Sequence, residues 1–374
     1  MGIKPVPAQN VGPGRILRRE LEAIGWSNAD LAEVLGMSGK SVSQLLNDKQ
    51  AITVPTARLL AQAFSSSPEF WMNLDQNYRL RLAPHDPKED ETALRAKIRA
   101  RMPLAEMRKK GWIDYDASAT SQVKAYRKFW DKDADDFSAY ERPDLPFCAR
   151  LGNQADRQGK QADRQTRDYS ITWFQKARSE ASRLKAKPYD RERTLALAAS
   201  LPDYTVESDG PRRFLSALKA CGVKFLILEH LSKTYLDGAS FMDEKNPVIV
   251  YTARYDRVDN FWWTLAHELA HVILHIKSAS DSFLDNLSDE AEVKGKEREA
   301  DAQASKWFRV EKLLKAAVPY AKYMTEVRLR EISEAVGLGP ELALGILQFN
   351  KVVEWRTLPK LKNAILFQIA TGKP

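Results

Sequence analysis

The sequence predicts a mainly α-helical, multi-domain protein that contains one small β-sheet. Its 374 residues exceed the usual size of one domain and favour roughly two or three. Segments such as 118–131, 170–186 and 211–221 repeat apolar residues at the spacing of an amphipathic helix. Two short runs, VKFLILE at 223–229 and PVIVYT at 247–252, are apolar and β-branched and predict strands.

The composition is that of an ordinary globular protein, with 44% hydrophobic and 29% charged residues. No apolar run approaches about 18 residues and the start carries no apolar signal segment, so we expect neither a membrane contact nor secretion. Cys148 and Cys221 lie far apart and outside any CxxC motif, which fits a reducing, cytoplasmic location. The net charge of +8 permits a nucleic-acid partner without showing one.

The first 80 residues contain a pattern typical of a helix-turn-helix, SNADLAEVLGMSGKSVSQLLNDKQ at 27–50. Ser27 is expected to cap a first helix, Gly36 to form the turn, and Ser38 to cap a second helix. Val42 falls where such a pair needs an apolar packing residue. A helical hairpin that serves only packing is the alternative to DNA binding.

The second helix offers four polar side chains on its exposed, N-terminal side. Such side chains can read base edges in a major groove, and glutamine can pair with adenine through two hydrogen bonds. The predicted DNA-contacting residues are Ser38, Lys40, Ser41 and Gln44.

Together with ITVPTARLLAQAFSSSPEFWMNLDQNYRL at 52–80, this stretch resembles the Cro-like (XRE) helix-turn-helix family, and within it the HigA-type antitoxins. The likeness covers roughly residues 10–82 and implies a five-helix domain. It also implies a homodimer that binds palindromic operator DNA and represses its own promoter.

The segment after this domain is simpler in organisation. Residues 83–94 are predicted to be a linker, because APHDPKEDE at 83–91 combines two prolines with a run of charges. A helical middle segment follows at 95–209. Its first part, 95–110, is strongly basic and forms either a solvated helix face or an auxiliary contact to phosphates. The polar repeat QADRQGKQADRQ at 154–165 predicts an exposed loop that offers a cleavage site.

Three of the five histidines lie in FWWTLAHELAHVILHIK at 261–277, a Gly- and Pro-free apolar run that predicts a helix. Chance gives about 0.009 HExxH matches in a chain of this composition. His267 and His271, four residues apart, share one helix face, and Glu268 lies about 100° around the axis. His275 lies roughly 12 Å along the axis from His267, too far to bind the same ion, so we expect it at a helix end or pocket wall.

A second helix is predicted for SDEAEVKGKEREADAQASKWF at 288–308, capped by one of its first two residues. Glu297 points with the apolar stripe of this helix, whereas Glu299 is turned about 200° away from it. Glu297 is therefore the predicted third metal ligand. Asp301, one turn later, is predicted to accept a hydrogen bond from the second ring nitrogen of a ligating histidine.

Two histidines and a carboxylate leave an open fourth position on a Zn²⁺ ion, as catalytic zinc sites do. The predicted chemistry is peptide hydrolysis, with Glu268 as the general base that takes a proton from water. Tyr251, Arg254 and Tyr255 precede the zinc helix and are candidates to stabilise the oxyanion. Manganese or iron also fits these ligands, and the same residues could hold a structural or regulatory ion or simply line a core.

The run PVIVYTARYDRVDNFWWTLAHELAHVILH, followed by EREADAQA, is similar to the ImmA/IrrE family of zinc metallopeptidases over roughly residues 210–310. The resemblance implies a zincin-like α+β domain and a protein substrate. It places the family's ligands and base on His267, His271, Glu297 and Glu268. We expect this domain, with a helical tail, to span 210–374. Where the repressor and the peptidase are separate chains, one cleaves the other. This sequence differs because it combines the DNA-binding pattern and the peptidase pattern in one chain.

Two functions follow from these patterns. The first is a transcriptional regulator whose zinc endopeptidase hydrolyses a regulatory protein, either a partner repressor or the chain itself. The second is a HigA-like antitoxin and autorepressor that binds operator DNA and a toxin partner, with a non-catalytic metal site.

Overall fold

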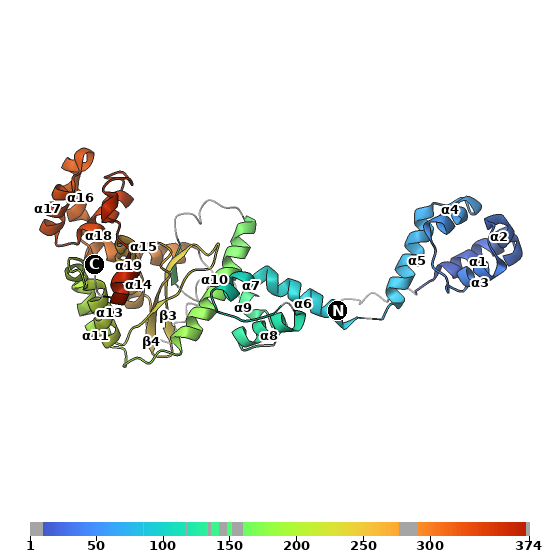
Figure 1. The fold of residues 1–374 in the computed structure, drawn as a ribbon, viewed down its shortest axis with the longest axis horizontal. Coiled ribbons are helices and arrows are strands. Elements are labelled where there is room, and N and C mark those ends of the chain that lie inside the picture. The colour runs from blue at the N-terminus through green and yellow to red at the C-terminus, as the bar shows by residue number, and fades with distance from the viewer. Residues whose placement is uncertain are drawn as a thin grey trace. The chain divides into compact units, whose positions relative to one another are not determined.

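The computed structural model describes residues 10–84, 86–116, 118–133, 136–141, 148–151, 160–276 and 290–371. The chain forms two compact units, Met1–Glu89 and Asp90–Pro374, and helices dominate both (Figure 1). No helix in this part of the chain combines the length and apolar character that a membrane span requires. The predicted fold class, mainly helical and multi-domain with a small sheet, is confirmed.

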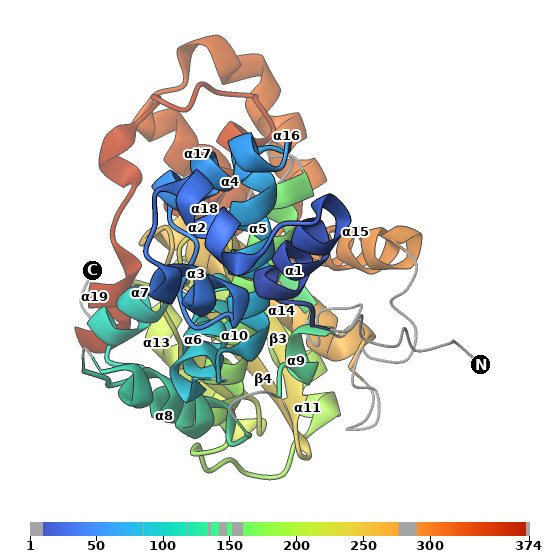
Figure 2. The same ribbon diagram turned by 90° about the vertical axis from the view of Figure 1, so that its right-hand side faces the viewer.

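The first unit consists of five helices, as predicted. Figure 2 shows them in blue: α1 (Pro13–Ile24), α2 (Asn28–Leu35), α3 (Gly39–Leu46), α4 (Val54–Ala63) and α5 (Pro68–Leu82). Ser27 caps α2 by accepting a hydrogen bond from the backbone N–H of Asp30, and Ser38 caps α3 in the same way through Ser41. Gly36 ends α2 in the left-handed conformation, with φ of 62°. The helix-turn-helix therefore begins and turns at the residues that the sequence indicated.

One apolar core holds these five helices together. It includes Leu17, Leu31, Val42, Leu60 and Trp71. The helices α1 and α3 approach most closely at Gly14, where an added Cβ would lie 2.1 Å from the carbonyl oxygen of Leu46. This contact fixes α3, which carries the predicted DNA contacts, against the body of the unit.

The second unit is built around a four-stranded sheet with the order β1-β3-β4-β2. Its strands are β1 (Cys148–Leu151), β2 (Lys224–Ile227), β3 (Leu236–Asp243) and β4 (Asn246–Tyr251). The pairs β1–β3 and β3–β4 are antiparallel, whereas β2–β4 is parallel. The sequence predicted β2 and β4 but missed β1 and the central strand β3. Most of β3 is buried, and its run LDGASFMD lacks the polar and apolar alternation that marks a half-exposed strand.

Helices surround this sheet. Before β2 lie α6 (Pro87–Arg101), α7 (Leu104–Lys109), α8 (Ala119–Trp130), α9 (Ser138–Glu141), α10 (Lys160–Ala181), α11 (Arg191–Ala199), α12 (Leu201–Thr205) and α13 (Gly210–Ala220). After β4 lie α14 (Val258–Leu274), α15 (Glu290–Trp307), α16 (Val310–Ala317), α17 (Glu326–Val336), α18 (Pro340–Phe349) and α19 (Ile365–Thr371), with short 3-10 helices at Val318–Tyr323 and Pro359–Leu361.

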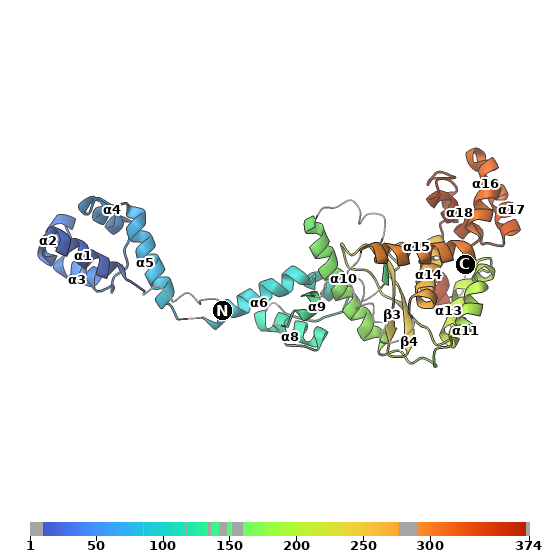
Figure 3. The same cartoon turned by 180° about the vertical axis from the view of Figure 1, so that it is seen from behind.

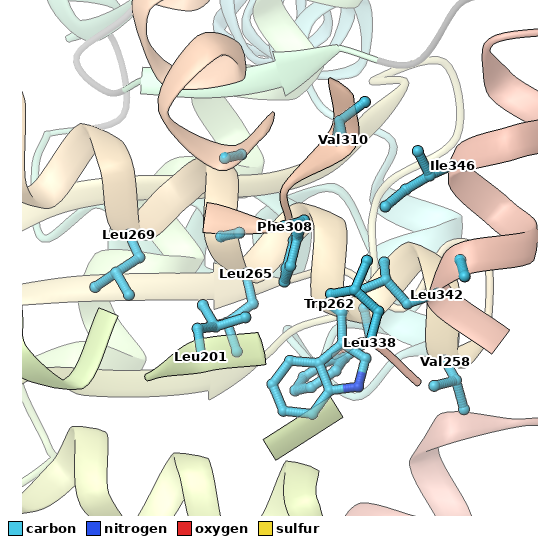
Figure 4. Packing of buried hydrophobic residues seen from close by; sticks show 14 of the residues in the cluster. Leu201, Val258, Trp262, Leu265, Leu269, Phe308, Val310, Leu338, Leu342 and Ile346 are labelled. Carbon is cyan, nitrogen blue, oxygen red and sulfur yellow. The ribbon is translucent and has the colours of Figure 1, made fainter. Parts of the chain in front are cut away.

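The sheet separates two apolar cores, and α10 and α14 lie on its opposite faces (Figures 1 and 3). Alternate residues of β4 show the division: Val248 and Val250 join the core with α10, whereas Ile249 and Tyr251 join the core with α14. In the core that includes α14, Trp262 packs with Phe308 and with Leu342 of α18 (Figure 4). The helix that carries the HExxH motif is therefore enclosed by the sheet and by C-terminal helices.

The structure differs from the predicted element boundaries at three places. The predicted linker 83–94 is helical from Pro87 onward, because α6 begins there. In the predicted loop 154–165, residues up to 159 lie outside the described part, and α10 already begins at Lys160. Residues of the predicted middle segment, 95–209, contribute to both cores of the second unit, so they pack together with the residues that follow them.

Candidate metal centre and DNA-binding surface

The helix α14 brings the predicted histidines into the interior of the second unit. It begins at Val258, with Arg257 as the N-cap residue, and Asp259 pairs with Arg257 across 2.9 Å in the first turn. His267 and His271 are 1% and 0% exposed. Burying two imidazoles in an apolar helix is costly unless their nitrogens are satisfied. Their partners therefore define the site.

Three predicted ligand residues meet at one point. The Nε2 atoms of His267 and His271 lie 3.1 Å apart. Glu297 of α15 places Oε2 at 3.1 Å from Nε2 of His267 and Oε1 at 3.3 Å from Nε2 of His271. Ligands about 2.0 Å from a tetrahedral ion lie about 3.3 Å from one another. The spacing and the nitrogen and oxygen donors therefore fit a single Zn²⁺ ion.

Asp301 lies next to this cluster, as the sequence predicted. Its Oδ1 is 2.9 Å from Nδ1 of His267, the ring nitrogen that faces away from Glu297. A carboxylate in this position fixes the tautomer and the orientation of a ligating imidazole.

His275 is the last member of the histidine row and forms the C-terminal cap of α14. It takes no place in the cluster of donor atoms, which consists of His267, His271 and Glu297. Its Nδ1 lies 2.9 Å from Nδ1 of His271, and its Nε2 lies 3.0 Å from Oε2 of Glu299. His275 lies at the helix end, as the sequence predicted, whereas its contacts with His271 and Glu299 were not predicted.

Glu268, the predicted general base, is fully buried between α14 and the sheet. Its carboxylate lies against Gly238 of β3, where an added Cβ would be 2.9 Å from Oε1 of Glu268. The missed strand β3 thus forms the wall behind Glu268, and the glycine makes room for the carboxylate.

The electrostatics of the cluster favour a bound cation. Burial acts to lower the pKa of His267, but Asp301 and Glu297 outweigh it and raise this pKa to about 9. Burial acts to raise the pKa of Glu297, but hydrogen bonds from His267 and His271 lower it to about 2. Burial lowers the pKa of His271. The carboxylates thus make the site electrostatically favourable for positive charge, and a bound zinc ion would take the place of the proton on His267.

The three candidates for stabilising the oxyanion have contacts of their own. The Tyr251 hydroxyl donates a hydrogen bond to the carbonyl oxygen of Tyr255 across 2.8 Å. Arg254 stacks on the rings of Tyr235 and Tyr255 at 5.3 and 5.2 Å. Tyr251 and Arg254 thus both contact Tyr255, in the segment between β4 and α14, and the role of the three residues in the reaction stays a prediction.

The predicted DNA contacts run from Ser38, the N-cap residue of α3, to Gln44 in the second half of this helix. Lys40 is exposed, and Ser41 and Gln44 are half-buried. The hydroxyl of Ser38 accepts a hydrogen bond from the backbone of Ser41 and lies 2.9 Å from the Ser41 hydroxyl. The two serines thus bond to each other as part of the cap, whereas Lys40 and Gln44, four residues apart, share one face of α3.

Basic side chains of the segment 95–110 have partners inside the second unit. Arg99 donates to Gln122 across 3.2 Å, and Arg101 lies 5.0 Å from the ring of Phe137. Lys110 pairs with Glu229. These contacts favour a structural role for the segment over the auxiliary phosphate contact.

Comparison with known proteins finds one family match in each of the two units. Residues 17–71 match the helix-turn-helix family model, and residues 221–344 match the IrrE N-terminal-like domain of the M78 peptidase family. An uncharacterised HTH-type transcriptional regulator of Haemophilus influenzae is 32% identical over 85 residues, which are 22% of this chain and 79% of that protein. Antitoxin HigA-1 of Vibrio cholerae is 40% identical over 65 residues, 17% of this chain and 61% of that protein.

A solved structure of an addiction module antidote protein of the HigA family from Coxiella burnetii is 36% identical, covering 20% of this chain and 84% of that chain, with a TM-score of 0.20. The match to the IrrE N-terminal-like domain covers β2 to β4 and the helices α14 and α15 with the histidine and glutamate cluster. The chain therefore belongs to the helix-turn-helix family of transcriptional regulators and carries, in its second unit, an IrrE N-terminal-like peptidase domain.

Proposed function

We propose that this protein is a DNA-binding transcriptional regulator whose second unit is a zinc-dependent endopeptidase that hydrolyses a regulatory protein. The observation that carries the proposal is the tetrahedral spacing of His267, His271 and Glu297 beside the buried carboxylate of Glu268. Three protein ligands leave a coordination position open, which distinguishes catalytic from closed structural zinc sites.

In this proposal each residue of the site has a definite task. His267, His271 and Glu297 hold the ion, and Asp301 orients His267. A bound Zn²⁺ ion polarises a carbonyl oxygen and acidifies water. Glu268 accepts the proton of the attacking water and then donates it to the leaving amine.

The substrate is proposed to be a protein that acts in regulation, either a partner repressor or this chain itself. The first unit would bind operator DNA through α3, as a homodimer in the cytoplasm. What supports this part is the match of residues 17–71 to the helix-turn-helix family and the four-residue spacing that puts Lys40 and Gln44 on one face of α3. Both activities in one chain would bring proteolysis to a promoter.

The test compares the wild type with Glu268→Gln, which removes the base but keeps its volume. Both proteins are incubated with products of the neighbouring genes, and each alone with its own promoter DNA, after their zinc content has been measured. We expect equal zinc content and cleavage by the wild type only. Equal zinc and DNA binding without cleavage by either protein would contradict the endopeptidase for those substrates.

A second candidate is a HigA-like antitoxin and autorepressor with a non-catalytic metal site. It is favoured by the 40% identity to antitoxin HigA-1 over 65 residues, which are 61% of that protein. Co-expression with a toxin encoded next to this gene tests it. Protection of the cells by Glu268→Gln as good as that by the wild type, together with a purified complex of both proteins, would favour the antitoxin.

A further inference from the structure

We infer that His275 and Glu299 form an outer hydrogen-bonded chain that holds His271 in the tautomer and ring orientation required of a metal ligand. The inference rests on the metal site proposed above and assigns His275 and Glu299 as positioning residues. Neither residue contacts the ion position in this assignment; both act through His271.

The contacts run outward from the cluster in one line. Nε2 of His271 faces Oε1 of Glu297 at 3.3 Å, so this nitrogen belongs to the donor set. On the opposite side of the ring, Nδ1 of His271 lies 2.9 Å from Nδ1 of His275. Nε2 of His275 then lies 3.0 Å from Oε2 of Glu299.

The chemistry of imidazole allows one arrangement of protons along this line. A metal ligand must offer a lone pair, so Nε2 of His271 carries no hydrogen and Nδ1 does. This N–H donates to Nδ1 of His275, which must then be the unprotonated nitrogen of that ring. The hydrogen of His275 is left on Nε2, where it donates to the carboxylate of Glu299. Each ring nitrogen thus has one partner and one role.

The same helix supplies the outer partner of both ligating histidines. Asp301 of α15 reaches His267 directly, whereas Glu299 of α15 reaches His271 through the intervening ring of His275. His275 lies one turn beyond His271 on α14, and its backbone N–H donates to the carbonyl oxygen of His271 across 2.9 Å. The His275 side chain is 5% exposed, so its ring is held in place, while Glu299 is 67% exposed at the outer end. The buried imidazole is therefore the link on which the orientation of His271 depends.

Two substitutions of His275 separate positioning from packing. His275→Phe keeps a ring of similar size but offers no acceptor to His271. His275→Asn loses ring volume but can place its amide oxygen close to the position of Nδ1. If the chain positions His271, His275→Phe should weaken zinc binding by about 10- to 100-fold, as is typical for loss of an outer hydrogen-bond partner, and His275→Asn should recover most of it. A packing role predicts the opposite order.

The measurements are the zinc dissociation constant of the full chain, by competition with a chromophoric chelator, and the visible spectrum of the Co²⁺-substituted protein. The unfolding temperature of the metal-free variants shows whether each one folds. Zinc binding by His275→Phe equal to the wild type, or a weaker site in His275→Asn than in His275→Phe, would overturn the inference. If the wild type binds no zinc, the proposed metal site itself fails, which is a different result.

A measurement on the wild type avoids dependence on variants that fold poorly. Long-range ¹H–¹⁵N correlation spectra of the zinc-loaded protein report which nitrogen of each of the five histidines carries hydrogen. We expect the hydrogen on Nδ1 of His271 and on Nε2 of His275. Hydrogen on Nδ1 of His275 would break the chain and overturn the inference.

Discussion

Gly238 of β3 lies directly against Glu268 of α14, at the position where the sheet meets the helix of the metal cluster. A Cβ at Gly238 would lie 2.9 Å from Oε1 of Glu268 and 2.6 Å from the methyl carbon of Thr264. Real Cβ atoms do not approach other atoms so closely, so only glycine lets the strand and the helix pack at this distance.

Replacement of this glycine is therefore expected to harm both stability and the site. Gly238→Ala should lower the free energy of unfolding by about 1–3 kcal/mol, because the extra methyl group overpacks a buried contact. It should also reduce the proposed peptidase activity through displacement of Glu268. Chemical denaturation measures the first effect. Gly295→Ala in α15 is the control, since nothing lies within 4 Å of its added Cβ; helix propensity predicts a gain of about 0.5–1 kcal/mol there. Equal stability of Gly238→Ala and the wild type would contradict the close packing.

Metal removal should destabilise the second unit, because the proposed ion is shared between α14 and α15. Zinc at 100 times its dissociation constant is expected to raise the free energy of unfolding by about 2.7 kcal/mol. Glu297→Gln should abolish most of this gain, since it removes the charged ligand. Thermal unfolding with zinc and with a chelator measures the effect. Glu311→Gln, on exposed Glu311 of α16, should respond to zinc like the wild type.

Substitutions of Lys40 and Gln44 of α3 are expected to change DNA binding in different ways. Gln44→Ala is expected to lose about 1–3 kcal/mol of discrimination between the operator and a mutated operator, if Gln44 reads a base. Lys40→Ala should weaken binding to both DNAs alike and reduce the salt slope by about 1, if Lys40 contacts phosphate. Gel-shift or anisotropy titrations at several salt concentrations distinguish these outcomes. Gln62→Ala on exposed Gln62 of α4 is the matched control, and it should leave both affinities unchanged.

Cys221 should be a slow nucleophile whose reactivity rises only at high pH. The thiol is 4% exposed, and burial raises its pKa above the ordinary value of 9.0. Cys148→Ser leaves Cys221 as the remaining cysteine, and its alkylation rate as a function of pH should have a midpoint above that of a free thiol. Because the folded-state pKa is raised, the associated stability is present below pH 9.0 and is lost as the pH rises through the folded-state value. A midpoint at or below the free-thiol value would exclude the effect of burial.

Local patterns account for what the sequence predicted correctly in the first unit. Caps and turns depend on residues three or four positions apart, so Ser27, Gly36 and Ser38 mark the helix-turn-helix without knowledge of the tertiary fold. The central strand β3 has no such local mark. Its residues are enclosed between helices on both faces of the sheet, which removes the alternation by which a strand is recognised.

In the metal cluster, too, some features follow from local sequence patterns and others only from tertiary packing. By itself the sequence determined that His267 and His271 share one face of a helix, because the period of the α-helix fixes that geometry, and it singled out Glu297 from a second helical pattern. The tertiary structure alone decided that Gly238 forms the wall behind Glu268 and that Glu299 reaches His271 through His275. The reason is physical: helical spacing fixes which side chains share a face, whereas contacts between α14, α15 and β3 depend on how separate elements pack.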